Sequence, residues 1–187
     1  MDYGDPPSEP DRYRYDPGDP TPSIGGPALL SRRAVVNNAP LERRADVLTY
    51  TSAPLDEPVE AIGPVRVCLY VRSSLERFDV FARVCDVDRS GVSRNVCDAL
   101  ERVAPERSSP DSQRTYRVEF ALWPTAHRFG RGHRVRLQVS SGAHPRYARN
   151  TGTGEPLGTA TRLLAADQEV FHDPKYRSEL VLSVVAG

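Results

Sequence analysis

The sequence predicts an all-β domain, built as an antiparallel sandwich or barrel. Apolar and polar residues alternate with a period of two in several short runs, and Gly, Pro, Asp and Ser separate these runs. No long stretch shows the 3.6-residue period of an amphipathic helix. The 187 residues can enclose one hydrophobic core but leave no room for a second large domain.

The first 45 residues are expected to form an extended arm and an irregular segment docked on the sandwich. Residues 1–27 carry seven of the 17 prolines, and proline fixes φ and removes a hydrogen-bond donor, which excludes a helix or a central strand. Tyr13, Tyr15 and Ile24 add apolar surface, which favours a docked arm over a free tail. The sandwich domain is expected to cover residues 46–187.

Period-two runs begin at residue 46. In the clearest run, Val65, Val67, Leu69 and Val71 alternate with other residues after the breaker at 63–64, and the turn residues 88–91 join two runs into an expected hairpin. A short helix is expected only at residues 162–169. The expected strands cover residues 47–51, 65–71, 78–87, 92–99, 118–122, 135–139, 170–172 and 180–185.

Charge and cysteine usage exclude several classes of protein. Lys and Arg number 25 and so do Asp and Glu, so no basic field favours nucleic acid or an anionic membrane. No apolar run approaches the roughly 20 residues that cross a bilayer, and the acidic N-terminus does not resemble a secretory signal. Cys68, Cys85 and Cys97 show no metal or disulfide spacing and are expected to be buried thiols. We therefore expect a soluble, cytoplasmic protein.

Motifs for catalysis and cofactor binding are missing or weak. The G-x-S-x-G turn that presents a nucleophilic serine in α/β-hydrolases does not occur. His127 and His133 lie six residues apart, which is not the usual spacing of a helical zinc pair. Residues 152–158 contain glycines but lack the Lys-Ser/Thr ending of a phosphate-binding loop. We expect no metal and no cofactor.

Several longer blocks occur in one order along nearly the whole chain: residues 11–26, 46–55, 58–64, 78–87, 124–141, 144–150 and 172–182. In these blocks the chain resembles the C-terminal β-domain of the CocE/NonD serine hydrolases, a family that includes cocaine esterase and X-Pro dipeptidyl-peptidase. The resemblance implies a jelly-roll-like antiparallel β-sandwich with an extended Pro-rich N-terminal arm. It also implies a non-catalytic domain that supports an α/β-hydrolase domain, absent from this chain, and lines its substrate cleft.

The resemblance places two residues at a substrate pocket. In the family, the segment after the paired glycines of the arm approaches the acyl side of the cleft, and Leu29 and Leu30 fall on those positions. Apolar side chains there would shape a pocket for a hydrophobic acyl or side-chain group.

A stand-alone protein is the alternative hypothesis. A sandwich without its hydrolase partner would expose an apolar interface, which could bind a small apolar ligand or support a non-hydrolytic reaction such as cyclisation or isomerisation. His144, His127, Tyr147 and Arg146 are the candidates for acid, base or anion-holding groups in that case. Pairing of the same surface into a homo-oligomer is a third hypothesis.

Overall fold

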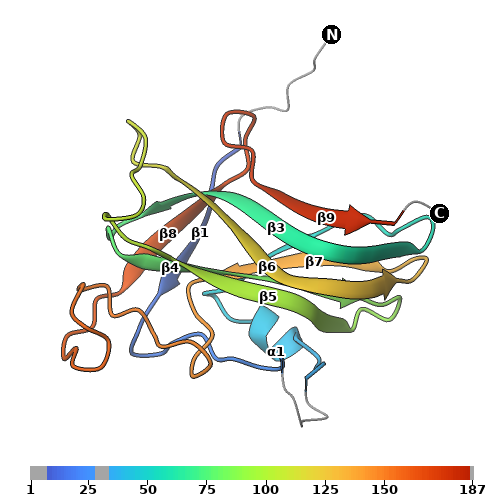
Figure 1. Ribbon diagram of the computed structural model, residues 1–187, viewed down its shortest axis with the longest axis horizontal. Helices are drawn as coiled ribbons and strands as arrows, with labels where there is room; N and C mark the ends of the chain where they lie inside the picture. Colours follow the sequence, from blue (N-terminus) through green and yellow to red (C-terminus); the bar gives the residue numbers. More distant parts are fainter. Residues whose placement is uncertain (1–7, 28–33, 186–187) are drawn as a thin grey trace.

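Two antiparallel β-sheets pack face to face in the computed structural model, which describes residues 8–27 and 34–185 (Figure 1). One sheet has the strand order β1-β8-β3-β6, with β9 also paired to β3, and the other has the order β2-β7-β4-β5. This architecture confirms the prediction of an all-β sandwich. The elements are β1 (Asp11–Tyr15), α1 (Ala39–Glu42), β2 (Leu48–Thr51), β3 (Val59–Ser73), β4 (Phe78–Val87), β5 (Ser93–Val103), β6 (Tyr116–Phe129), β7 (Arg134–Ser140), β8 (Ala166–Phe171) and β9 (Glu179–Val184).

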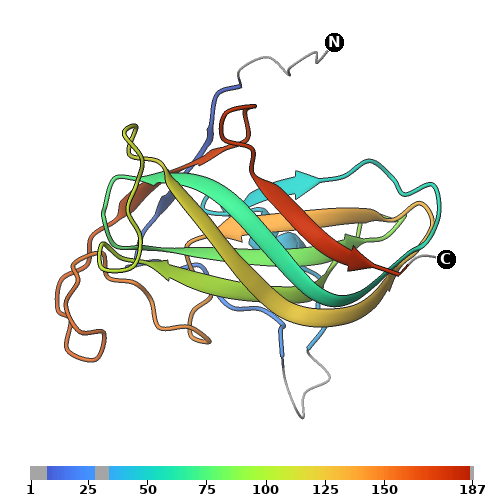
Figure 2. The ribbon, with the colours of Figure 1, turned by 45° about the horizontal axis from the view of Figure 1, so that its top comes forward.

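The sequence alternation places one face of each strand in the core. Val65, Val67, Leu69 and Val71 of β3 are buried and oppose apolar residues of β6, while Arg66 faces outward. Figure 2 shows β9, β3 and β6 running side by side across the five-stranded sheet. The expected hairpin of β4 and β5 is confirmed, and its turn is fixed by bonds to the Asp88 carboxylate from Ser90 and Val92.

The expected break at residues 63–64 is wrong, because β3 runs through it. The β3–β6 pairing continues on both sides of a register shift between Gly63 and Val65, and Gly63 has a φ of +120°. Glycine takes this conformation without steric cost, so the two residues form a bulge instead of ending the strand.

The expected helix at residues 162–169 is also wrong. Residues 161–165 have no regular structure, and β8 begins at Ala166. β8 pairs with β1 on one side and with β3 on the other, and these hydrogen bonds override a weak local preference for helix.

Two short elements were missed in the first 45 residues. β1 is an edge strand that pairs only with β8, and it buries Tyr13 and Tyr15 in the shared core. α1 is a single turn with Pro40 in its first turn and Leu41 buried. The division of the chain at residue 45 stays a prediction, although β1 belongs to the same sheet as the sandwich strands.

Burial also sets the pKa of cysteine thiols in this domain. Cys68, Cys85 and Cys97 are unpaired and buried. Burial raises the pKa of Cys85 to about 12, and burial together with the Asp98 charge raises the pKa of Cys97 to about 12. Among the described residues, no helix has both the length and the apolar character needed to cross a membrane.

These thiols predict a loss of stability in alkali. Below pH 9 the Cys85 and Cys97 thiols are protonated in both the folded and the unfolded chain. Above pH 9 the thiols of the unfolded chain lose their protons, whereas those of the folded chain keep them up to about pH 12. Each thiol then lowers the free energy of unfolding by up to about 1.4 kcal/mol per pH unit. Urea unfolding between pH 9 and pH 10 measures this slope. The tyrosines of the unfolded chain, with a pKa of about 10, begin to ionise in the same range, so the contribution of the thiols is read from the difference between the wild-type chain and a variant without them. A Cys85→Ala, Cys97→Ala double variant should show a shallower slope, and an unchanged slope would assign the loss to other groups.

Candidate functional site

Residues 25–27 and 34–36 lie side by side over the four-stranded sheet, and we call these two segments the stem. The Gly26 amide donates a hydrogen bond to the Ala34 carbonyl over 2.8 Å. We refer to residues 28–33, which connect the two segments in the sequence and lie outside the described residues, as the loop. The predicted pocket residues Leu29 and Leu30 are among them, so their position stays a prediction.

Asn95 of β5 holds one side of the stem. Its Nδ2 donates to the Ala34 carbonyl over 2.8 Å, and its Oδ1 accepts from the Val36 amide over 2.9 Å. Asn38 continues the contact, because its amide donates to the Ser93 carbonyl and its Nδ2 donates to the Val36 carbonyl. The buried amide side chains thus replace the backbone pairing that a further strand would supply.

A buried ion pair lies beneath the stem. Arg83 of β4 donates through Nε and Nη2 to Oδ2 of Asp98 on β5, at 3.0 and 2.9 Å, and the two side chains are 0% and 1% exposed. Arg83 Nη1 also donates to the Ile24 carbonyl at 2.7 Å and to Asn38 Oδ1 at 2.8 Å. One guanidinium therefore connects both chain segments that lead into the loop.

Arg146 completes this cluster. Its Nη1 donates to Asp98 Oδ1 at 2.5 Å, and its Nη2 donates to the Tyr147 hydroxyl at 3.1 Å. The guanidinium also stacks on the Tyr147 ring, 4.9 Å from its centroid. A Cβ atom placed on Gly26 would lie 2.7 Å from Arg146 Nη1, so the glycine permits the close approach. We call Arg83, Asp98 and Arg146 the arginine–aspartate cluster.

The structure brings together three of the four candidate acid–base residues. His144 lies in the same loop as Arg146 and Tyr147. Its backbone amide donates a hydrogen bond to the Thr21 carbonyl, and its carbonyl accepts one from the Ser23 amide, which joins this loop to the arm. Its side chain is exposed. The guanidinium groups and the carboxylate of the cluster bind one another, and Arg146 also binds the Tyr147 phenol. This arrangement suits positioning of the loop more than proton transfer.

His127 lies apart from this group. Its Nε2 lies 3.0 Å from Asp86 Oδ2, and Nδ1 of His133 lies 2.8 Å from Asp86 Oδ1. The three side chains join the ends of β4 and β6 to the turn before β7. Across the described part of the chain, no three His, Cys, Asp or Glu side chains are arranged to hold a metal ion.

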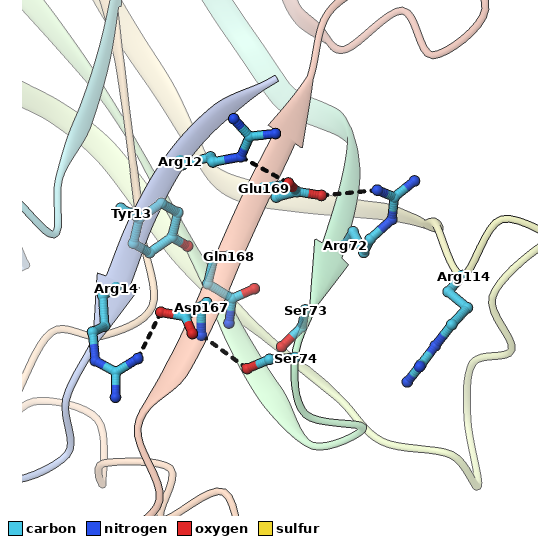
Figure 3. A pocket seen from close by; sticks show the side chains of 10 residues that line it. All are labelled: Arg12, Tyr13, Arg14, Arg72, Ser73, Ser74, Arg114, Asp167, Gln168 and Glu169. Carbon is cyan, nitrogen blue, oxygen red and sulfur yellow. Dashed lines mark hydrogen bonds and ion pairs between the residues drawn. The ribbon is translucent and has the colours of Figure 1, made fainter. Parts of the chain in front are cut away.

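A recess of about 760 Å³ lies over β1, β8 and β3 (Figure 3). Its outer side chains form a ladder of ion pairs: Glu169 accepts from Arg12 and Arg72, and Asp167 accepts from Arg14. Arg12, Arg14 and Asp167 are each more than 60% exposed, and such pairs contribute little to binding or stability. Backbone pairing fixes the register of the three strands, and we do not assign the recess a ligand.

A Ser-His-Asp arrangement that sequence reasoning missed lies at the edge of the sandwich. Ser8 Oγ is 3.0 Å from His172 Nδ1, and His172 Nε2 is 3.2 Å from Asp11 Oδ2. A catalytic triad excludes water and holds its carboxylate buried, whereas the Asp11 side chain is 45% exposed and that of His172 36%. His172 lines a recess of about 290 Å³ to which Ser8 does not contribute. The three residues tie the arm to the end of β8.

Comparison with known proteins assigns the chain. Residues 4–181 match the family model of the X-Pro dipeptidyl-peptidase C-terminal non-catalytic domain. The chain belongs to this family. Its predicted resemblance to the C-terminal β-domain of CocE/NonD hydrolases is thereby confirmed, and so is its role as a non-catalytic domain of such hydrolases. The stand-alone hypothesis is not favoured.

The chain spans about one third of the length of the similar proteins, which are therefore about three times as long as this chain. Cocaine esterase from Rhodococcus sp. (strain MB1 Bresler) is 32% identical over 184 residues, which cover 94% of this chain and 32% of the esterase. An α-amino acid ester hydrolase structure matches with a TM-score of 0.83 and 28% identity, covering 95% of this chain and 33% of that one. An aminopeptidase structure from a marine sediment Thaumarchaeota archaeon matches with a TM-score of 0.83 and 22% identity, covering 98% and 34%; it supports the fold alone.

The buried cluster predicts a large difference between two aspartates that each pair with arginine. Asp98→Ala would leave Arg83 buried without its partner and should cost about 3–5 kcal/mol of unfolding free energy. Asp167→Ala removes an exposed pair and should cost less than about 1 kcal/mol. Urea unfolding of both variants measures the contrast. Equal costs would show that the cluster does not stabilise the fold.

The close approach at Gly26 gives a second prediction. Gly26 and Gly91 have φ values of +103° and +85°, so alanine strains the backbone at both, by about 1–2 kcal/mol. Nothing lies near a Cβ at Gly91, whereas Gly26→Ala must also displace Arg146 and should cost more. Thermal unfolding measures the difference in stability between Gly26→Ala and Gly91→Ala. This difference should shrink when Arg146→Ala is added to both variants. If Gly26→Ala stays equally more destabilising without the arginine, the contact with Arg146 is not its cause.

Proposed function

We propose that the chain supports an α/β-hydrolase catalytic domain and lines its substrate cleft with the loop between Gly26 and Ala34. The observation that carries this proposal is the closure of the stem over the buried arginine–aspartate cluster. A loop on a fixed stem is the usual way in which a rigid β-scaffold contributes to a binding site. Family membership supports the catalytic partner, since the family is defined as the non-catalytic domain of X-Pro dipeptidyl-peptidase.

The proposed substrate class is an ester or amide with an apolar acyl or side-chain group. The relatives that support this class are an esterase and an α-amino acid ester hydrolase, and the family is named after a dipeptidyl-peptidase. Leu29 and Leu30 are the proposed apolar lining of the pocket. Arg146 and Tyr147 are proposed as positioning residues for the loop, His144 as an exposed neighbour of the stem, and His127 as a structural partner of Asp86.

A cytoplasmic location is also proposed. The support is that all three cysteines are unpaired and buried, which suits a reducing compartment. The proposed partner is the catalytic domain; neither a homo-oligomer nor a small ligand is needed for this function.

The proposal predicts that activity requires a catalytic domain. The purified 187-residue chain should not hydrolyse 4-nitrophenyl butyrate above the rate with heat-denatured chain. A chimera in which this chain replaces the matching C-terminal portion of the Rhodococcus cocaine esterase should hydrolyse the ester. Within the chimera, replacing Leu29 and Leu30 with Ala should change KM for acyl chains of different length more than it changes kcat.

The Ser8–His172–Asp11 arrangement supplies the control. Activity of the chain alone that Ser8→Ala abolishes would reveal a catalytic centre in this domain and overturn the proposal. If the two leucine substitutions leave the acyl-length preference of the chimera unchanged, the loop does not line the cleft.

A further inference from the structure

An exposed tryptophan lies next to the stem. Trp123 of β6 is the one tryptophan in the chain, and it is 59% exposed. Val35, in the stem, is also 59% exposed. Between them lies a recess of about 290 Å³, which is lined by both halves of the stem and by two strands: Gly26, Pro27, Ala34, Val35, Asn95, Val96, Cys97, Asp98, Trp123 and Pro124.

The apolar surface continues outward across the five-stranded sheet. Ile62 of β3 is 54% exposed and pairs with Ala126 of β6, three residues beyond Trp123. In Figure 2, β3 and β6 lie side by side. We call Trp123, Val35 and Ile62 the tryptophan face.

This face departs from the pattern of its own strands. Further along β3 and β6, outward positions carry charged residues such as Arg66, Arg117 and Glu119. A large exposed aromatic beside a recess, within a group of exposed aliphatic residues, is characteristic of a binding surface. Tryptophan is also among the residues that contribute most to the affinity of protein interfaces.

We propose that the tryptophan face is the docking surface for the α/β-hydrolase catalytic domain. This inference rests on the proposed function and names the surface through which it acts. The recess beside Trp123 is lined by the two ends of the loop, so a domain that receives the loop must also meet this recess. About two-thirds of each matched relative lies outside the region that matches this chain, which is enough to cover such a face.

The test is binding of the full 187-residue chain to the remaining portion of the Rhodococcus cocaine esterase, produced without its matching C-terminal region. Calorimetry measures affinity for the wild-type chain, Trp123→Glu and Ile62→Glu. Each substitution places a charge in the interface and should weaken binding at least tenfold. Leu157→Glu is the matched control, because Leu157 is 44% exposed in the loop region after β7 and should leave affinity unchanged.

A second readout follows the indole itself. Labelling with 5-fluorotryptophan gives one ¹⁹F resonance, because Trp123 is the one tryptophan. Docking should shift this resonance, and it should protect the label from broadening by a paramagnetic agent in solution. This measurement does not depend on a variant that could misfold.

The outcomes separate the two proposals. If the wild-type chain does not bind the catalytic portion, the proposed function fails. If it binds with an unchanged ¹⁹F resonance and with equal affinity for Trp123→Glu, the docking surface lies elsewhere, and only this inference is overturned. The chain could instead self-associate through this face. If Trp123→Glu abolishes self-association and leaves binding of the catalytic portion unchanged, the face binds a second copy of this chain, and the docking inference is overturned.

Discussion

The buried pair of Arg83 and Asp98 is the interaction on which the stem depends. A guanidinium without access to water must have its donors satisfied, because an unpaired buried charge costs several kcal/mol. Arg83 meets that requirement with one carboxylate, one amide oxygen and the Ile24 carbonyl. The path of the chain before and after the loop therefore follows from the need to satisfy a buried charge on the outer face of the four-stranded sheet, whereas the strands themselves follow from apolar burial.

Much of the sandwich could be predicted because its strands obey a local rule. β4 matches its expected range, and β2, β7 and β9 differ from theirs by one residue at one or both ends, since each is a short run rich in apolar residues between clear turn signals. The errors come from interactions between distant segments. β3 and β6 pair through Gly63 and Pro64, and β8 forms between two strands that are far from it in the sequence.

The site was less predictable than the fold. The family resemblance directed attention to the segment after the paired glycines, and chemistry alone suggested Arg146 and Tyr147. Asp98 and Asn95, which hold the stem, were missed, although both lie in β5, the second strand of the expected hairpin. The available signal was Arg83, a charged residue inside the apolar run 78–87, because a buried arginine requires a buried acceptor. Sequence spacing does not show which acceptor folds against it.

The bond between Gly26 and Ala34 has a consequence for how such domains diversify. A loop whose ends are joined at the base can be lengthened, shortened or replaced without moving the strands beneath it. The entropy cost of closing a longer loop grows slowly, by about 0.6 kcal/mol for each doubling of its length. Under the proposed function, substrate preference can then change by exchange of this one segment, without any change in the buried charges beneath the stem.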